Sequence, residues 1–179
     1  MKSGTAIARA GVFAAALLSL GSVPAHAEVA AQGEAGFRVE HSVIANVSEK
    51  KAWAAVLAPG AWWSSEHSWS GDARNMRLDA KLGGCWCERW KGGEVRHMSV
   101  VALFPGSKIV LEGGLGPLQA MGVSGAMTIS VTPEGEGSKI SFSYSVGGVF
   151  DPPAAALAPA VDGVIGEQAG RLKSYLEAE

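Results

Sequence analysis

The chain has 179 residues, 47% of them hydrophobic, with 15 basic and 17 acidic side chains and a net charge of −2. A chain of this length is the usual size for one domain with a single core. Its slightly acidic balance argues against nucleic acid or an anionic membrane surface as a partner. We therefore expect one soluble domain that binds neither.

Residues 1–27 have the three parts of a secretory signal peptide. Lys2 and Arg9 make the start basic, residues 10–20 are apolar, and residues 25–27 form the small-x-small site Ala-His-Ala. The apolar run is much shorter than the roughly 20 residues that cross a bilayer. We expect cleavage after Ala27, leaving a periplasmic or secreted protein without a membrane span. The alternative is an N-terminal core helix.

The segment 28–36 is small and polar, and we interpret it as a flexible leader before the fold. From Phe37 onward, apolar and polar residues alternate with the period of half-buried strands. The turn residues at 133–137 predict a hairpin between the last two strands. About seven strands are predicted, at 37–45, 76–81, 85–91, 95–104, 108–112, 127–131 and 140–146.

Two segments have helical signals. Ser48 can cap a helix over 48–57, which Pro59 and Gly60 would end. A long helix is predicted over 159–178, with Pro159 in its first turn. Its glycines are spaced about one turn apart, which suits a helix close to a sheet or beside a cavity. The element order predicts an α+β domain with an antiparallel sheet curled around the last helix.

Five segments make the chain similar to the SRPBCC, or START-like, superfamily with the helix-grip fold, in particular its polyketide cyclase and heat-shock-ATPase-activator-like branch. They are FRVEHSVIA, SEKKAWAAVLAPGAWW, LGGCWCER, VRHMSVVALFPGSKIVLEG and VDGVIGEQAGRLKSYLE, and they extend over most of the chain after residue 36. The chain also resembles exported members of unassigned function. The resemblance implies a deep apolar cavity between the sheet and the C-terminal helix. It leaves function open, because this fold hosts binders, carriers and enzymes.

Aromatic and apolar residues are the candidate ligand contacts. Three tryptophans cluster in a loop after the first helix, and the glycine-rich but apolar segment 113–125 has the composition of a lid. The alternatives are that the tryptophans close the end of the sheet as core, and that 113–125 is an ordinary surface loop. The predicted contacts are Trp62, Trp63, Trp69, Trp86, Leu115, Leu118, Met121, Phe142 and Tyr144.

Glu88 and His97 are the candidate acid–base pair. If Gly92 and Gly93 form the tip of a hairpin, Glu88 lies directly opposite His97. A carboxylate and an imidazole beside tryptophans can shift each other's pKa values and act as acid and base. The alternative is a structural ion pair.

Cys85 and Cys87 are the only cysteines, and in a strand they share a face with Cα atoms about 6.5 to 7 Å apart, at the limit for a disulfide. We favour buried thiols, with a redox pair or a link between chains as alternatives. A zinc site would need two more ligands. The sequence lacks a nucleotide fingerprint, so neither metal nor cofactor is predicted. The titratable residues His67, Asp72, Glu112 and Asp162 are interpreted as structural or solvated.

These patterns predict an exported protein that binds a small hydrophobic or aromatic molecule between sheet and helix. The alternative is an enzyme of cyclase, dehydratase or isomerase type that acts on such a molecule through Glu88 and His97. A chaperone-ATPase activator is disfavoured, because export separates the chain from a cytoplasmic ATPase. The sequence leaves open the ligand, the oligomeric state and whether any reaction occurs.

Overall fold

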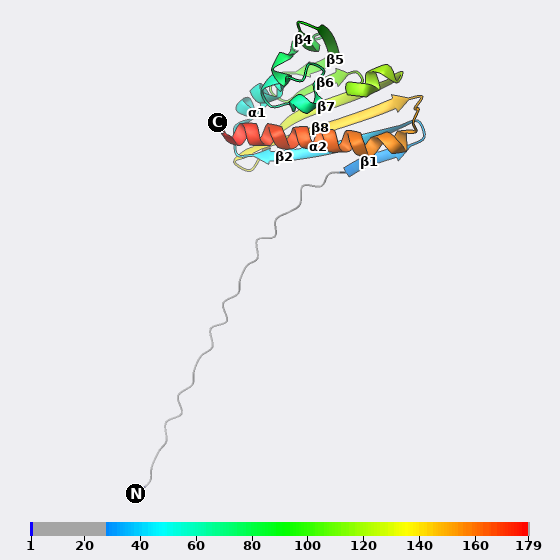
Figure 1. Ribbon diagram of the computed structural model, residues 1–179. Helices are drawn as coiled ribbons and strands as arrows, with labels where there is room; N and C mark the ends of the chain where they lie inside the picture. The colour runs from blue at the N-terminus through cyan, green and yellow to red at the C-terminus, as the bar shows by residue number, and fades with distance from the viewer. Residues whose placement is uncertain (2–27, 179) are drawn as a thin grey trace.

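The sheet and the C-terminal helix dominate the computed structural model, which describes Met1 and residues 28–178 (Figure 1). The predicted signal peptide lies outside the described residues. Eight antiparallel strands form one curved sheet, and α2 lies against it, which confirms the predicted helix-grip fold. The strands are β1 Glu28–Gly33, β2 Gly36–Ala45, β3 Met76–Leu78, β4 Cys85–Trp90, β5 Gly93–Phe104, β6 Lys108–Glu112, β7 Val123–Glu134 and β8 Gly137–Gly148; the helices are α1 Glu49–Val56 and α2 Ala154–Ala178.

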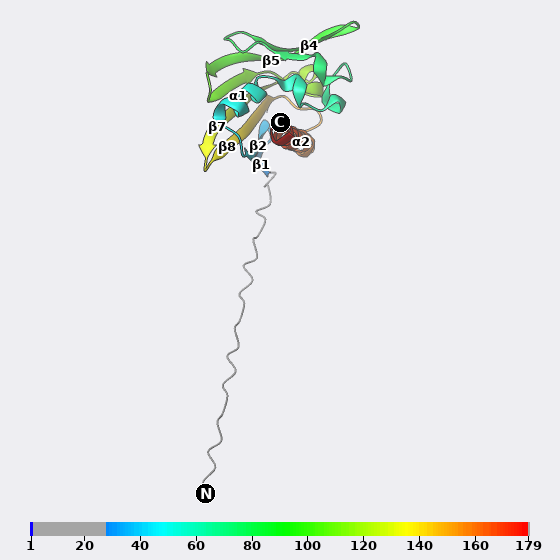
Figure 2. The ribbon, with the colours of Figure 1, turned by 90° about the vertical axis from the view of Figure 1, so that its left-hand side faces the viewer.

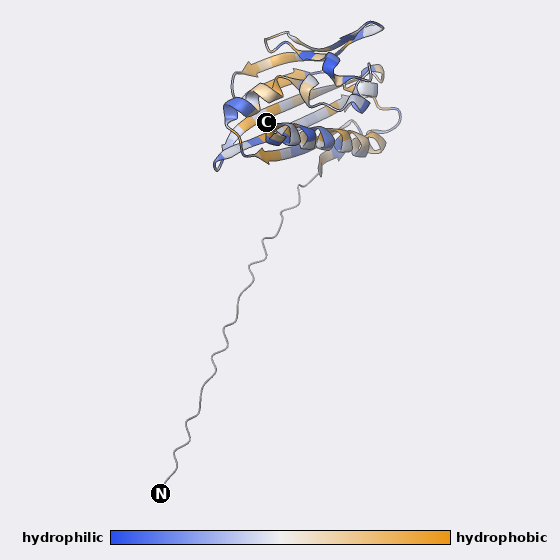
Figure 3. Ribbon diagram, turned by 60° about the vertical axis from the view of Figure 1, so that its left-hand side comes forward, coloured by the Kyte–Doolittle hydropathy of each residue, from blue (hydrophilic) through white to orange (hydrophobic). Residues whose placement is uncertain are grey.

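The strand order β1-β2-β8-β7-β6-β5-β4-β3 places β1 and β3 at the two edges and the last strand, β8, inside the sheet between β2 and β7. β7 and β8 form the predicted hairpin, with pairing from Glu134 opposite Gly137 to Val123 opposite Gly148. Apolar and polar residues alternate along the strands (Figure 3), so one face of the sheet supplies the core. In the view along α2, the helix lies on the concave side of the curved sheet (Figure 2).

The prediction of a flexible leader over residues 28–36 is wrong. Residues 28–33 form strand β1, which pairs with β2 from Glu28 opposite Glu40 to Gly33 opposite Gly36. The sequence of this strand has no clear apolar alternation, and the backbone of β2 supplies its hydrogen bonds. The count of strands is therefore eight instead of seven.

The first helix agrees with its prediction, and the second begins earlier. Ser48 caps α1, since its side chain accepts a hydrogen bond from the Lys51 amide at 3.3 Å. α2 begins at Ala154 instead of Pro159, so Pro159 lies inside the helix and not in its first turn. Between α1 and β3, the chain forms three short 3-10 helices: η1 Pro59–Ala61, η2 Ser65–His67 and η3 Ala73–Asn75. A fourth, η4 Gly116–Ala120, precedes β7.

α2 lies close against the sheet at Gly166. A Cβ atom there would lie 2.7 Å from Cε1 of His41 on β2, and His41 itself is hydrogen-bonded to Asp162 of α2 at 2.8 Å. The other two glycines of this helix, Gly163 and Gly170, have no such neighbour. Of the three glycines that were expected to allow close packing of the helix on the sheet, only Gly166 is therefore needed for it.

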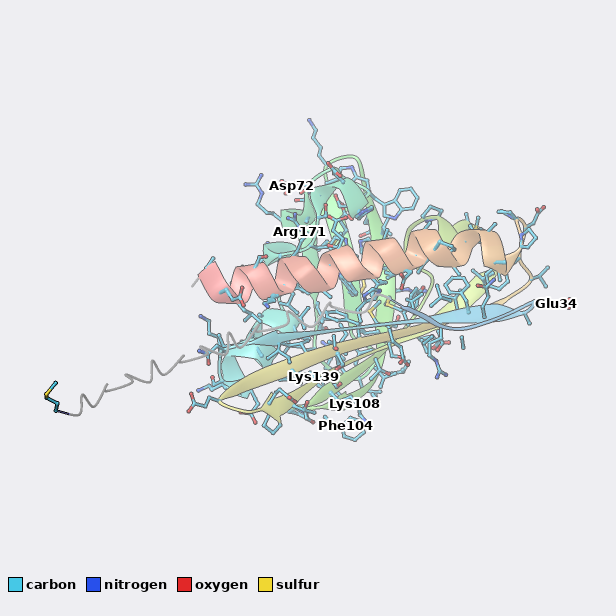
Figure 4. All side chains as sticks on the ribbon, turned by 90° about the horizontal axis from the view of Figure 1, so that it is seen from below. Glu34, Asp72, Phe104, Lys108, Lys139 and Arg171 are labelled. Carbon is cyan, nitrogen blue, oxygen red and sulfur yellow. A yellow bond between two sulfur atoms is a disulfide. The ribbon has the colours of Figure 1, made fainter. Side chains whose placement is uncertain are left out.

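The other face of the sheet points away from α2. Phe104 and Lys108 lie on that side (Figure 4), where the Lys108 ammonium stands 4.4 Å from the centre of the Phe104 ring. Phe104 is half-exposed there. The cavity described below lies on the opposite, concave side.

Candidate functional site

A cavity of about 440 Å³ lies between the first half of α2, the short helices η2 and η4, and one residue of β5. This volume is within the usual range for sites that hold a small molecule. Most of the lining side chains are apolar, and among the described lining residues none is Lys or Arg. The lining residues are Trp63, Glu66, His67, Ser68, Trp69, His97, Leu115, Gly116, Pro117, Leu118, Met121, Leu157, Ala160, Val161, Val164 and Ile165.

Tyr144 attaches the predicted lid to the sheet. Its hydroxyl donates to the Gly113 carbonyl at 3.0 Å and accepts from the Leu115 amide at 3.1 Å. Burial raises the pKa of Tyr144 to about 12, so the phenol stays neutral. The ring fits because residue 125 is glycine: a Cβ there would lie 2.5 Å from Cε2 of Tyr144. The segment around η4 is thereby held over the cavity.

Side chains of α2 attach the segment that carries the clustered tryptophans. Gln168 accepts a hydrogen bond from the Ser64 amide at 2.8 Å, and Arg171 donates to the Trp62 carbonyl at 2.9 Å. At the mouth of the cavity, Nε2 of His67 lies 3.0 Å from Glu167. The helix and the tryptophan segment therefore form one connected wall.

Glu88 anchors the same segment from the sheet side. The carboxylate is fully buried and accepts hydrogen bonds from the amides of Trp69 at 3.1 Å and Ser70 at 2.6 Å, and from His97 at 3.0 Å. Burial raises the pKa of Glu88, but the hydrogen bonds from Ser70, Trp69 and His97 outweigh it and hold the pKa below its usual value. Glu88 is therefore an ionised acceptor at neutral pH.

His97 is the buried polar residue of the cavity wall. Its Nε2 bonds to Oε2 of Glu88, and its ring packs 5.8 Å from that of Trp86. Burial lowers the pKa of His97, although Glu88 acts in the opposite direction, so the imidazole is neutral at pH 7. The other ring nitrogen, Nδ1, has no hydrogen-bond partner among residues 28–178 and is not one of the buried unpartnered atoms. It is accessible from the cavity.

The predicted hairpin register is wrong, although the predicted contact between Glu88 and His97 is present. The hairpin turns at Lys91 and Gly92, so Trp90 pairs with Gly93 and Glu88 pairs with Val95. Arg96 then pairs with Cys87 and Met98 with Trp86, which leaves His97 as the extra residue of a β-bulge. The bulge turns the His97 side chain to the inner face, toward Glu88.

The structure places five of the nine predicted ligand contacts at the cavity: Trp63, Trp69, Leu115, Leu118 and Met121. The other four belong to the core. The ring of Trp62 packs edge-on against that of Phe142, with 6.3 Å between the ring centres, and the ring centre of Trp86 lies 4.9 Å from that of Trp63. The hydroxyl of Tyr144 is hydrogen-bonded to the backbone of the lid. The aromatic cluster is therefore divided, with Trp63 at the boundary between core and cavity.

The sequence predicts the cavity beside the C-terminal helix, but the predicted ligand contacts include no residue of this helix. Leu157, Ala160, Val161, Val164 and Ile165 line the cavity, and their spacing of three and four residues marks one face of a helix. The signal was present in the sequence. Placing Pro159 in the first turn removed residues 157 and 158 from the helix and hid the beginning of this face.

Cys85 and Cys87 form a disulfide in the structure, so the favoured prediction of buried thiols is wrong. Their Cα atoms are 5.3 Å apart, closer than two positions of a flat strand. The register shift between Trp86 and Cys87 accompanies this shortening, because a bulge bends and twists the local ladder.

The remaining titratable candidates have structural or exposed positions. Asp72 caps η3 and binds Arg74, and the hydrogen bonds from Arg74 lower the pKa of Asp72. Asp162 pairs with His41, and Glu112 is exposed. Within residues 28–178, no group of three or more His, Cys, Asp or Glu side chains is placed to hold a metal ion. In the same part of the chain, no helix has the length and hydropathy of a membrane span.

The fold and the site together define a helix-grip domain with an apolar cavity and one buried histidine in its wall. Residues 36–177 match the family described as polyketide cyclase / dehydrase and lipid transport, and the chain belongs to this family. Membership supports a ligand-binding or cyclase-like role. A search of the curated proteins found no match.

Solved structures with the same fold differ widely in sequence. The chain is similar to CV1439 of Chromobacterium violaceum, with 15% identity, 79% and 98% of the two chains covered and a TM-score of 0.57. It is also similar to Ara h 8.0201, with 12% identity, 79% and 98% coverage and a TM-score of 0.54. A third similar structure is DynU16, a protein in the dynemicin biosynthetic locus, with 17% identity, 78% of this chain and 47% of that chain covered, and a TM-score of 0.56. At these identities the likeness concerns the fold alone.

Proposed function

We propose that this protein is an exported binding protein for a small hydrophobic or aromatic molecule, held in the cavity between α2, η2 and η4. The observation that carries the proposal is the mainly apolar cavity of about 440 Å³ with two tryptophans in its wall. Burial of an apolar ligand there gains about 25 cal/mol per Å² of apolar surface removed from water. The family description, which includes lipid transport, supports the same class of ligand.

Binding can be tested with the protein purified from its own compartment. Native mass spectrometry is expected to detect one apolar passenger for each chain, and a hydrophobic probe is expected to quench the fluorescence of Trp63 and Trp69. A cavity that is always empty, together with unchanged fluorescence, contradicts the proposal.

A pair of variants of α2 locates the binding. Val164 lines the cavity, whereas Ala156 is exposed and does not. V164F should fill the cavity and weaken probe binding at least about tenfold, while A156F adds the same ring outside the cavity and should leave binding unchanged. Equal effects of the two variants would place the probe elsewhere.

Export is proposed from residues 1–27, whose basic start, apolar middle and Ala-His-Ala site are typical of a cleaved signal. Cell fractionation followed by intact-mass measurement tests it. We expect a chain that begins at Glu28 outside the cytoplasm. A full-length chain that stays in the cytoplasm refutes export without affecting the binding proposal.

A second candidate function is acid–base catalysis, and the Glu88–His97 pair is the observation that favours it. In such a reaction, Nδ1 of His97 would take a proton from an acidic C–H of the bound molecule, while Nε2–H stays bonded to the Glu88 carboxylate. Returning that proton to another atom of the same molecule gives an isomerisation that needs no co-reactant.

Proton exchange of an enolisable ketone tests this candidate. With 2-tetralone in D₂O, wild-type protein should speed deuterium incorporation beside the carbonyl, as followed by NMR, and H97Q should not. Exchange at the same rate with and without protein rejects the catalytic function.

A further inference from the structure

Among the described residues that line the cavity, His97 is the one buried polar side chain, and its Nδ1 has no hydrogen-bond partner within residues 28–178. The other charged or polar side chains among the described lining residues are Glu66, His67 and Ser68, and all three belong to the segment around η2. The side chain of His67 is 33% exposed, whereas that of His97 is 5% exposed. Among the described residues, a ligand inside the cavity therefore meets one unpartnered polar side-chain atom on the sheet side, Nδ1 of His97.

The hydrogen bonds of Glu88 determine which ring nitrogen of His97 carries the proton. Because Glu88 already accepts from the amides of Trp69 and Ser70, its carboxylate acts as an acceptor toward His97 as well. The proton of the neutral ring must then be on Nε2. Nδ1 is left with a lone pair, and it is a hydrogen-bond acceptor only.

The surroundings restrict what this acceptor can bind. The cavity wall has no Lys or Arg among its described residues, and the Glu88 carboxylate lies directly behind His97. An anionic ligand such as a fatty-acid carboxylate would have no counter-charge here and would be repelled by Glu88. A neutral hydroxyl supplies a donor without a charge, whereas a ligand that covers Nδ1 without supplying a donor leaves a buried acceptor unpaired, which is unfavourable.

We infer that the ligand is a neutral apolar molecule with a hydroxyl group, which donates its hydrogen bond to Nδ1 of His97. This inference rests on the proposed binding function and adds the chemical class of the ligand. It makes His97 the residue that distinguishes a hydroxylated ligand from an ether or hydrocarbon of the same shape. The apolar wall of α2 contributes affinity for the hydroxylated ligand, the ether and the hydrocarbon alike.

Two probes of almost the same shape test the inference, 1-hydroxypyrene and 1-methoxypyrene. Their dissociation constants are measured by isothermal titration calorimetry with the mature wild-type protein. We expect 1-hydroxypyrene to bind about three- to tenfold more tightly, the range that corresponds to one net hydrogen bond.

Two histidine variants form a matched pair for the same measurement. In H97Q the amide nitrogen can take the place of Nε2 and keep the bond to Glu88, but the only remaining acceptor is the amide oxygen, which does not occupy the position of Nδ1. In H67Q the same change is made at the other cavity histidine, which is also bonded to a glutamate. The preference for the hydroxyl should fall to about onefold in H97Q and persist in H67Q.

The outcomes separate the inference from the function on which it rests. Equal binding of both probes by wild-type protein overturns the inference and leaves the binding function standing. Loss of the preference in H67Q instead of H97Q also overturns it. If neither probe binds, the binding function fails as well.

A measurement on wild-type protein avoids any folding defect of H97Q. In ¹⁵N-labelled protein, the Nδ1 resonance of His97 should move when 1-hydroxypyrene is added and remain in place with 1-methoxypyrene. An Nδ1 resonance that already carries a proton in the free protein contradicts the assigned tautomer and overturns the inference.

Discussion

The two walls of the cavity are built in different ways. On the sheet side, β4 and β5 present Glu88 and His97, which are buried and connected through three hydrogen bonds to the Trp69–Ser70 backbone and to each other. On the helix side, α2 presents an apolar face whose position depends on the close fit of Gly166 against His41. The sheet therefore contributes a buried polar group to the cavity, whereas α2 contributes an apolar surface.

The two histidine–glutamate pairs show the same difference. His97 and Glu88 are both buried, whereas the side chains of His67 and Glu167 are 33% and 41% exposed. The N–O distance is 3.0 Å in both pairs, so the distance alone does not distinguish them. Burial makes the partner of the first pair indispensable, because water cannot replace it.

The largest effect is expected for E88Q. The amide of glutamine cannot accept from all three donors, and its NH₂ group would face one of them, so a buried network loses its acceptor. We expect the free energy of unfolding to fall by about 3 to 5 kcal/mol, measured by urea denaturation. E167Q, at the exposed pair, should lower it by less than about 1 kcal/mol. Similar losses of stability in the two variants would show that burial does not make the Glu88–His97 pair more important than the His67–Glu167 pair.

A change at Gly166 tests the helix side. In G166A the new Cβ would lie 2.7 Å from Cε1 of His41, a ring that its bond to Asp162 keeps from moving freely. The expected loss of stability is about 2 kcal/mol. G163A on the same helix meets nothing within 4 Å and should gain about 1 kcal/mol. A gain in both variants would show that steric fit does not position α2.

Removal of one hydroxyl tests the lid, which joins the two walls. Y144F loses the bonds to Gly113 and Leu115 and should cost about 1 kcal/mol of stability. Hydrogen exchange at the Leu115 amide should become faster while exchange in β2 changes little. S143A, which removes an exposed hydroxyl of the same strand, is the control. Unchanged exchange at Leu115 would mean that Tyr144 does not hold the lid.

The smallest effect is expected from mild acid, because burial and Glu88 shift the pKa of His97 in opposite directions. Burial dominates, so the pKa of folded His97 lies below its ordinary value of 6.5. The unfolded chain then takes up this proton at higher pH than the folded chain, and stability falls as the pH drops below about 6.5. The lowered pKa of Glu88 adds a further loss below its ordinary value of 4.5.

Urea midpoints measured from pH 8 to pH 4 test the acid dependence, with H97Q as the reference. The decrease in stability that begins near pH 6.5 should be absent in H97Q, and the decrease below pH 4.5 should remain. Wild-type stability that rises between pH 6.5 and pH 5 would reverse the sign of the His97 shift.

Periodicity in the sequence predicted the central strands and both helices, because one-sided burial repeats every two residues in a strand and every three to four in a helix. It could not reveal β1, since Ala30 and Ala31 carry no apolar alternation and the strand is held by backbone bonds to β2. The beginning of α2 was misplaced because Pro159 is compatible with a first turn as well as with the interior position it occupies.

The site was less accessible to sequence reasoning than the fold. Trp63 and Trp62 are neighbours with the same chemistry, yet only Trp63 lines the cavity, and that division depends on packing between distant segments. The pair of Glu88 and His97 was predicted from a register that the structure does not have. The bulge that brings them together has no local signal, because it depends on how β4 and β5 align over their whole length.

This bulge also bears on how the site can be gained or lost. Arg96 pairs with Cys87 and Met98 with Trp86, so the ladder is regular on both sides of His97. Deleting that one codon would rejoin a continuous ladder without altering the strand order of the sheet. His97 is therefore an insertion in an otherwise complete ladder, and a single insertion or deletion is enough to add or remove the buried polar group that the sheet contributes to the cavity.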